Sequence, residues 1–188
     1  MARPRSEDKR SAILEAATRA VETNGLGAPT AGMAEAAGVA NGSLFTYFKT
    51  KSDLFNQLYL ELKTGMAAAI MEDLPRGAGL REQLLHIWQN WMSWAASFPG
   101  RRRVLAQLGA SDQLTPDTRA AGHAAMAQIA ELLERSRANG PMRGAPRGFV
   151  VAITNSVAEA TMDYMAQDPA NSNDHARTGF DALWRVLA

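Results

Sequence analysis

Cysteine is absent from the 188-residue sequence, which excludes disulfide bonds, thiolate metal sites and cysteine nucleophiles. No apolar run reaches the roughly 20 residues that a membrane-spanning helix requires. The first ten residues are charged and no apolar segment follows them, so a secretory signal peptide is not expected. We therefore expect a cytoplasmic protein that makes no membrane contact.

A strong net charge is also missing, because 20 basic residues nearly balance 19 acidic ones and leave +1. The overall charge therefore names no partner. Residues 1–51 hold seven basic and five acidic residues, or +2, and the remainder carries −1. Any contact with nucleic acid is expected near the N-terminus. The length and the 46% hydrophobic content suit one domain, or a small domain joined to a larger one.

Signatures of catalysis are missing as well. The sequence lacks a His-Glu-x-x-His motif, a phosphate-binding loop and a dinucleotide-binding glycine pattern, and its only histidines are His86, His123 and His175. Glu82 and His86 could share a metal ion, but a lone pair at this spacing is far more often a surface ion pair. Ser111 has no glycine elbow around it. We expect no enzyme, no metal and no cofactor.

Apolar residues recur at helical spacing through nearly the whole sequence, without a strand pattern or an internal repeat. Helices are expected from Ser6 to Gly25, over 30–37, over 41–48 and over 51–71, where Thr50 and Asp53 have the spacing of a capping box. The two short helices meet at Gly38 and form a helix-turn-helix over about 29–48. Proline and glycine separate five more helices, at 80–98, 101–109, 116–138, 146–167 and 174–187.

One segment of the sequence carries a resemblance. Residues 33–54 read M-A-E-A-A-G-V-A-N-G-S-L-F-T-Y-F-K-T-K-S-D-L. With its glycine, aromatic and lysine positions in register, this segment resembles the TetR-family signature I-A-x-x-A-G-V-S-x-G-x-L-Y-x-H/Y-F-x-x-K-x-x-L. The match covers about residues 8–55. It implies an all-α fold of about nine helices, with a three-helix DNA-binding domain over 1–50 and a ligand-binding and dimerisation domain over 51–188.

The helix-turn-helix also has a physical interpretation of its own. Gly38 permits the sharp turn, while Leu44 and Phe48 anchor the second helix on the core. Its other face can then enter a major groove about 12 Å wide. The residues expected to face the DNA are Asn41, Gly42, Ser43, Thr46 and Tyr47.

Roles follow from side-chain chemistry. The amide of Asn41 can pair with adenine, and the methyl of Thr46 suits thymine. Phosphate contacts are expected from Thr30, Ser43, Tyr47 and Lys51. The resemblance also allows Arg3 and Arg5 to reach the backbone or the minor groove.

Three positions depart from the family pattern. Ala40 stands where a serine or threonine usually caps the recognition helix, so Asn41 could supply the cap instead. Phe45 replaces a common tyrosine, which removes one hydroxyl for a phosphate. Pro29 replaces a frequent threonine and moves the expected cap of the preceding helix to Thr30.

The larger domain is rich in tryptophan and methionine, which commonly line apolar ligand cavities. We expect a mostly apolar or aromatic small molecule there, although the same residues could simply fill the core. The candidate pocket residues are Trp88, Trp91, Met92, Met126, Asn155, Tyr164 and Met66.

The helix at 147–167 is apolar nearly all round, which predicts that it is covered on every side. One side could face the core and the other a second copy of the chain across a twofold axis. The alternative is that the final helix packs only on its own domain. The candidate interface residues are Val150, Val157, Phe180, Leu183, Trp184 and Leu187.

These inferences predict a ligand-responsive transcriptional regulator, most simply a repressor, that binds a near-palindromic operator in double-stranded DNA as a dimer. A small molecule would release it by favouring a conformation in which the helix at 51–71 has swung. The alternative is a helical small-molecule-binding or adaptor protein that no longer binds DNA.

Overall fold

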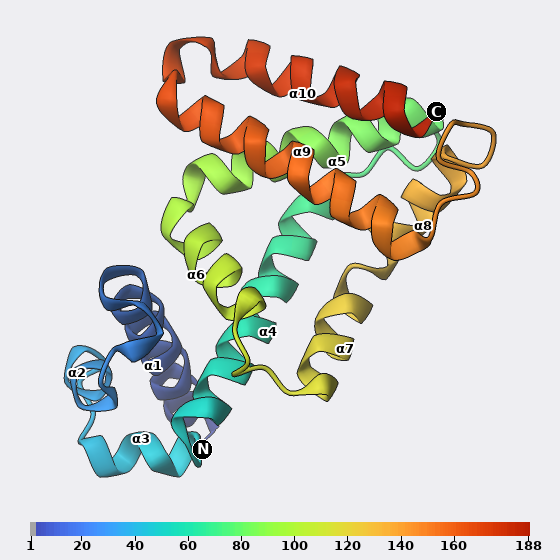
Figure 1. Ribbon diagram of the computed structural model, residues 1–188. Coiled ribbons are helices and arrows are strands. Elements are labelled where there is room, and N and C mark those ends of the chain that lie inside the picture. The colour runs from blue at the N-terminus through green and yellow to red at the C-terminus, as the bar shows by residue number, and fades with distance from the viewer. Residues whose placement is uncertain (1–2) are drawn as a thin grey trace. The chain divides into compact units, whose positions relative to one another are not determined.

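The computed structural model describes residues 3–188, with side chains from Ser6 onward, and every regular element in that range is a helix (Figure 1). The predicted all-α fold class is confirmed. Two single-turn 3₁₀ helices, η1 (Gly25–Gly27) and η2 (Pro169–Asn171), join ten α-helices: α1 (Arg3–Asn24), α2 (Thr30–Ala36), α3 (Asn41–Tyr47), α4 (Lys51–Met71), α5 (Leu80–Ser97), α6 (Pro99–Ala110), α7 (Pro116–Ala125), α8 (Ala127–Ser136), α9 (Arg147–Gln167) and α10 (Ser172–Leu187).

The chain forms two compact units that alternate along the sequence. Unit 1 comprises residues 1–64 and 98–124, and unit 2 comprises residues 65–97 and 125–188. Helix α4 therefore belongs to unit 1 up to Thr64 and to unit 2 from Gly65. Unit 1 extends beyond the helix-turn-helix because α1 packs against α6 as well as against α2.

Unit 1 is organised around α1. The apolar stripe expected on this helix is buried, and it consists of Ile13, Leu14, Ala17 and Val21. Gly25 ends α1 with φ +68°, and Gly38 makes the α2–α3 turn with φ +67°. Both angles lie in the left-handed region, which glycine adopts without a steric penalty. The predicted functions of these two glycines as helix terminators are confirmed.

Unit 2 is built on a hairpin of α9 and α10, which fold back on each other through η2 (Figure 1). Helix α5 packs against α8, α9 and α10. At Gly179, helix α10 lies very close to Thr161 of α9 and Trp88 of α5, since a Cβ at this position would collide with both side chains. This close contact directs the apolar side of α10 into the core of its own unit.

Several predicted helix boundaries need correction. Helix α1 begins at Arg3, so Ser6 lies within the helix and does not start it. Thr30 is the first residue of α2 and Pro29 is its cap, while Ala40 rather than Asn41 caps α3. Neither cap makes a side-chain hydrogen bond, so backbone geometry alone starts these short helices.

The single helix predicted over 116–138 is in fact two, because the backbone at Met126 leaves the helical region (φ −98°, ψ 7°). The apolar spacing continues across the break, which explains the prediction. The two helices belong to different units, almost all of α7 to unit 1 and all of its successor α8 to unit 2. Tertiary packing therefore overrides the local pattern here.

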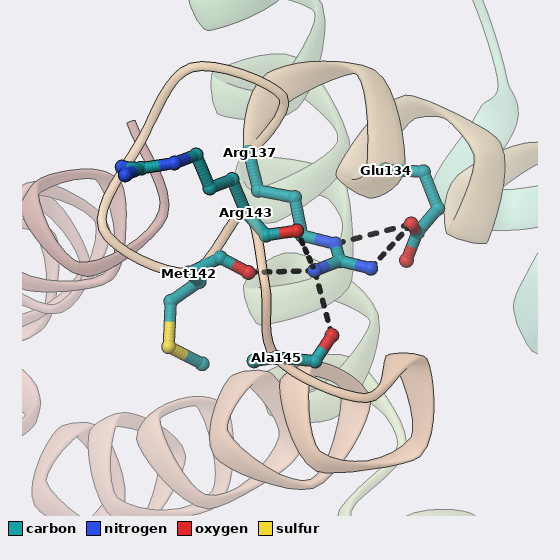
Figure 2. Close-up of polar contacts among 5 residues, drawn as sticks. All are labelled: Glu134, Arg137, Met142, Arg143 and Ala145. Carbon is teal, nitrogen blue, oxygen red and sulfur yellow. Dashed lines mark hydrogen bonds and ion pairs between the residues drawn. The ribbon is translucent and has the colours of Figure 1, made fainter.

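The loop between α8 and α9 is organised by the buried side chain of Arg137 (Figure 2). Its Nη1 donates hydrogen bonds to the carbonyl oxygens of Met142 at 2.6 Å, Arg143 at 3.3 Å and Ala145 at 2.8 Å. Its Nε and Nη2 bind the Glu134 carboxylate at 3.1 Å and 2.6 Å. One guanidinium thus satisfies three carbonyl groups of an irregular segment.

Candidate functional site

Helices α2 and α3 meet in a short turn that fixes the angle between them. The backbone N–H of Gly38 donates to the carbonyl of Glu35, and that of Val39 donates to the carbonyl of Ala34, both at 3.0 Å. Ala34 is buried at the crossing. The small side chains and the left-handed glycine therefore bring the two helices together as the sequence predicts.

Helix α3 is held by one face and exposed on the other. Leu44 and Phe48 are buried and anchor the helix on unit 1. Among the residues predicted to face DNA, Tyr47 is half-buried and the others are exposed. Phe45, which was not among them, is also exposed. The exposed set is therefore Asn41, Gly42, Ser43, Phe45 and Thr46.

A polar groove of about 260 Å³ runs along one side of α3. Hydroxyl-bearing residues of α3 and residues of the turn line it, together with Lys9 from α1. The lining residues are Lys9, residues 38–40, Ser43, Thr46 and Tyr47. Hydroxyl groups and an ammonium group are suited to phosphate oxygens. Sequence reasoning missed Lys9, because only the packing of α1 beside the turn brings it to this groove.

The start of α4 is capped as the spacing of Thr50 and Asp53 predicts, with one difference. The backbone N–H of Asp53 donates to the Thr50 Oγ1 at 3.0 Å. The Asp53 carboxylate accepts from the backbone N–H of Lys49 at 3.2 Å, one residue earlier than in a capping box. Lys51 is half-buried, with its Nζ 5.3 Å from the centre of the Phe55 ring. The ring restricts this cation to one side of the helix start.

Two further side chains fix α4 within unit 1, and the sequence pattern did not identify them. Arg10 lies over the Phe48 ring at 5.6 Å and donates to the Gln57 Oε1 at 2.9 Å. The buried Asn56 amide donates to the carbonyl of Gln113 at 2.9 Å and accepts from the N–H of Thr115 at 2.9 Å. The side chains of Arg3 and Arg5, also predicted to reach DNA, lie outside the part that the structure describes.

Unit 2 contains a narrow apolar cavity of about 30 Å³, room for roughly one water molecule. Four aromatic rings form part of its wall, and consecutive centroids along the series Trp91, Trp88, Phe180 and Trp184 are 6.3–6.4 Å apart. The Trp88 Nε1 donates to the carbonyl of Ala176 at 2.8 Å, which fixes that ring. The other lining residues are Leu84, Ile87, Ile129, Leu133, Thr154, Leu183 and Leu187.

The structure brings together only part of the predicted pocket. Trp88 and Trp91 line this cavity, whereas Met66, Met92 and Met126 do not. Met66 and Met92 are buried elsewhere, and Met126 is half-buried at the helix break. Asn155 and Tyr164, also predicted for the pocket, do not line this cavity: both are exposed on α9, and Tyr164 is 61% exposed.

Most of the residues predicted for a subunit interface are already covered by their own chain. Val150, Phe180, Leu183 and Leu187 are at most 4% exposed, so they have no area left for a partner. Trp184 lines the cavity, and Val157 is half-buried. Phe149 on α9 is 54% exposed in the single chain, so the expectation that α9 is covered on every side stays a prediction that requires a second copy.

Polar side chains on α5 fix the far end of α4 within unit 2. The His86 Nε2 lies 2.6 Å from the carbonyl oxygen of Glu72, so this nitrogen donates to it. The Asn90 amide donates to the carbonyls of Ile70 at 3.2 Å and Glu72 at 3.1 Å. Because Trp88 and Trp91 lie on the same helix, α5 both lines the cavity and holds the C-terminal carbonyls of α4.

Among the residues that the structure describes, no group of three or more histidine, aspartate or glutamate side chains lies close enough to hold a metal ion. Within residues 3–188, the helices are either too short or too polar to cross a bilayer.

Comparison with known proteins gives consistent relationships. Residues 13–58 match the model of a family described as bacterial regulatory proteins, tetR family. The HTH-type transcriptional regulator AcrR of Shigella flexneri is 28% identical over 109 residues, 55% of this chain and 48% of that protein. The chain thus matches about half the length of this curated relative.

Solved structures match over almost the whole chain. A TetR-family transcription regulator from Shewanella sp. PV-4 has a TM-score of 0.87 and 26% identity, with 96% of this chain and 98% of that chain covered. The regulator LfrR from Mycobacterium smegmatis, in complex with proflavine, has a TM-score of 0.70 and 18% identity over 96% and 98% of the two chains. Both units therefore have counterparts in these proteins.

Proposed function

Because the chain belongs to the TetR family of transcriptional regulators, we propose that it represses transcription by binding a near-palindromic operator as a homodimer and leaves the DNA when a small molecule binds. The observation that carries this proposal is the arrangement of exposed and buried residues on α3. The exposed residues of α3 lie opposite the buried Leu44 and Phe48, and a polar groove that includes Lys9 runs beside them. This arrangement fits a recognition helix in a major groove with phosphates along one side.

The dimer is supported by apolar surface that a single chain leaves exposed. Phe149 at the start of α9 is 54% exposed, and Val186 near the end of α10 is 38% exposed. Helices α9 and α10 run antiparallel (Figure 1). The start of α9 and the end of α10, which carry these two residues, therefore lie at the same end of the hairpin. A twofold axis here would place the same patch on both copies. The two α3 helices would then read half-sites about 34–36 Å apart.

The ligand is proposed to be mostly apolar or aromatic. The aromatic wall of the unit 2 cavity supports this, as does the proflavine bound by LfrR. The space of about 30 Å³ is well below the roughly 300 Å³ at the lower end of small-molecule sites. Binding therefore requires α5, α8 or α10 to move, and a ligand that requires movement can select one conformation over another.

Helix α5 offers a route from the cavity to α4. A displacement of Trp88 and Trp91 also displaces His86 and Asn90, which hold the carbonyl end of α4. Helix α4 continues into unit 1, where Asn56 fixes it to residues 113–115. Binding of the ligand would then weaken binding of DNA through linkage, and the reverse, provided that the ligand binds the DNA-free conformation more tightly.

The proposal is tested by binding of the full chain to a duplex taken from the region upstream of its own gene. Fluorescence anisotropy should show binding that survives excess scrambled competitor DNA. The Lys51→Ala variant should bind every duplex more weakly, with a salt slope shallower by about 0.9 for each phosphate that the variant no longer neutralises. The Glu61→Ala variant, altered at an exposed site in the middle of α4, is the matched control.

The alternative is a helical small-molecule-binding protein that no longer binds DNA. It predicts equal affinity for the upstream and scrambled duplexes, together with binding of proflavine, measured by calorimetry without DNA. Retention of proflavine binding and loss of sequence preference would favour this alternative and reject repression. Trp91→Ala should weaken proflavine binding and leave DNA affinity unchanged, because Trp91 lines the cavity of unit 2.

A further inference from the structure

Phe45 is an exposed aromatic residue on the recognition helix that the helix-turn-helix core does not use. Its side chain is 40% exposed, although the neighbouring Leu44 is fully buried. Among the described residues, no aromatic ring or cation is stacked on it. Phe98 is similarly exposed, but the Arg101 guanidinium lies 4.7 Å from its ring centre. Phe45 therefore presents a bare ring at the surface proposed to meet DNA.

Gly42 lies three residues before Phe45, and the fold does not require a glycine there. A Cβ on Gly42 would meet nothing within 4 Å, and its φ is not in the left-handed region. Glycine is among the least favourable residues within a helix. Because helical side chains lean toward the N-terminus, the Phe45 ring is directed toward the space that Gly42 leaves open. The two residues form an apolar notch on α3.

The two sides of α3 differ in chemistry. Ser43, Thr46 and Tyr47 line the polar groove with Lys9, and these groups suit phosphate oxygens. The notch lies outside that groove, since neither Gly42 nor Phe45 lines it. The phenylalanine ring lacks the hydroxyl that a tyrosine would offer to a phosphate. The Phe45 ring is therefore suited to contact an apolar group on the edge of a base.

Only one base presents such a group in the major groove, namely thymine, through its C5-methyl. We propose that Phe45 and Gly42 form a receptor for a thymine methyl group, which makes Phe45 a specificity-determining residue. This inference rests on the proposed function, since it requires α3 to enter the major groove. It adds a base contact to those expected from Asn41 and Thr46.

The first experiment selects duplexes from a random library with the full chain. The thymines of a selected duplex are then replaced one at a time by deoxyuridine, which removes only the methyl group. Burial of one such group corresponds to about a fourfold change in affinity. At one thymine in each half-site, the substitution should weaken wild-type binding by about fourfold.

The variants assign that methyl group to a side chain. In Phe45→Ala, deoxyuridine at the sensitive position should make no further difference, because the receptor is gone. In Thr46→Ser, which removes only the methyl group of the rival candidate for a thymine contact, the fourfold sensitivity at this position should remain. In Gly42→Ala, binding of the thymine duplex should weaken while the helical circular dichroism signal is kept.

Three results would overturn the inference. Tight binding that is insensitive to deoxyuridine at every thymine would leave no methyl group for Phe45 to contact. Sensitivity that persists in Phe45→Ala, or that disappears in Thr46→Ser, would assign the contact to another residue. Failure of the wild-type chain to enrich any duplex would remove the proposed function as well, and this result is distinct because it needs no variant.

Discussion

Two connections between helices, the α2–α3 turn at residues 37–40 and the α8–α9 loop at residues 137–146, are held in different ways. The short turn depends on the left-handed backbone of Gly38 and on small neighbours such as Ala34. The longer loop depends on Arg137, whose guanidinium binds three carbonyl groups within the loop (Figure 2). A short turn can be held by backbone conformation, whereas a long irregular segment needs a side chain to satisfy its polar groups.

The strongest test of this comparison is Arg137→Met. The variant keeps the length of the side chain but leaves loop carbonyls and the Glu134 carboxylate without their partner. The free energy of unfolding should fall by about 3 kcal/mol, as for other broken buried ion pairs. Urea denaturation measures the change. Arg135→Met, at an exposed site on the same helix, is the control and should change stability by less than about 0.5 kcal/mol.

A second test concerns Gly140 in the same loop. A Cβ at this position would collide with the backbone carbonyl of Leu187 at the end of α10. We expect Gly140→Ala to lower the free energy of unfolding by about 2 kcal/mol, because backbone must shift. The control is Gly144→Ala, where a Cβ meets nothing within 4 Å. Equal thermal stability of the two variants would show that the backbone at the end of α10 shifts without a cost in free energy.

The third test returns to the short turn. Gly38→Ala forces a Cβ into the left-handed region and should cost about 1–2 kcal/mol, measured by thermal unfolding. Gly38→Asn should lose less, since asparagine adopts this conformation more readily. Gly32→Ala within α2 meets no neighbour and should instead stabilise the protein by about 0.5–1 kcal/mol. If side chains held the turn instead, the stabilities of these three variants would not rank in this order.

The smallest effect is expected from Glu134→Gln. This variant weakens the ion pair but leaves all three carbonyl contacts of Arg137 in place. Glu134 is also partly exposed, so we expect a loss of about 1 kcal/mol or less. A loss equal to that of Arg137→Met would mean that the carboxylate, and not the carbonyl groups, makes the arginine necessary.

The sequence predicts the helix-turn-helix well because its determinants are local. Gly38, the buried Leu44 and Phe48, and the Thr50 cap all act within a few residues, and each lies where the pattern places it. The exposed ridge of α3 follows from the same periodicity. Lys9 could not be assigned, since it reaches the groove only through the packing of α1.

Unit 2 is less predictable because its helices have apolar residues on several faces. The composition of α10 indicates a buried stripe, but it does not say whether the stripe faces its own core or a second copy. The close approach at Gly179 decides this, and it leaves Phe180 and Leu183 inside the unit. Tyr164 illustrates the converse: it is an aromatic residue on a largely apolar helix, and it lies at the surface of its own chain.

The order of the two units along the chain has a consequence for synthesis on the ribosome. Unit 1 contains residues 98–124 in addition to residues 1–64, and α1 packs on α6 from the later segment. The nascent chain must therefore hold α1 without one of its packing partners while residues 65–97 emerge. A domain at the start of a chain ordinarily folds first as it leaves the exit tunnel. Here the DNA-reading part is completed only once residues 98–124 have been made, so a polypeptide truncated before them would carry the motif on an unfinished core.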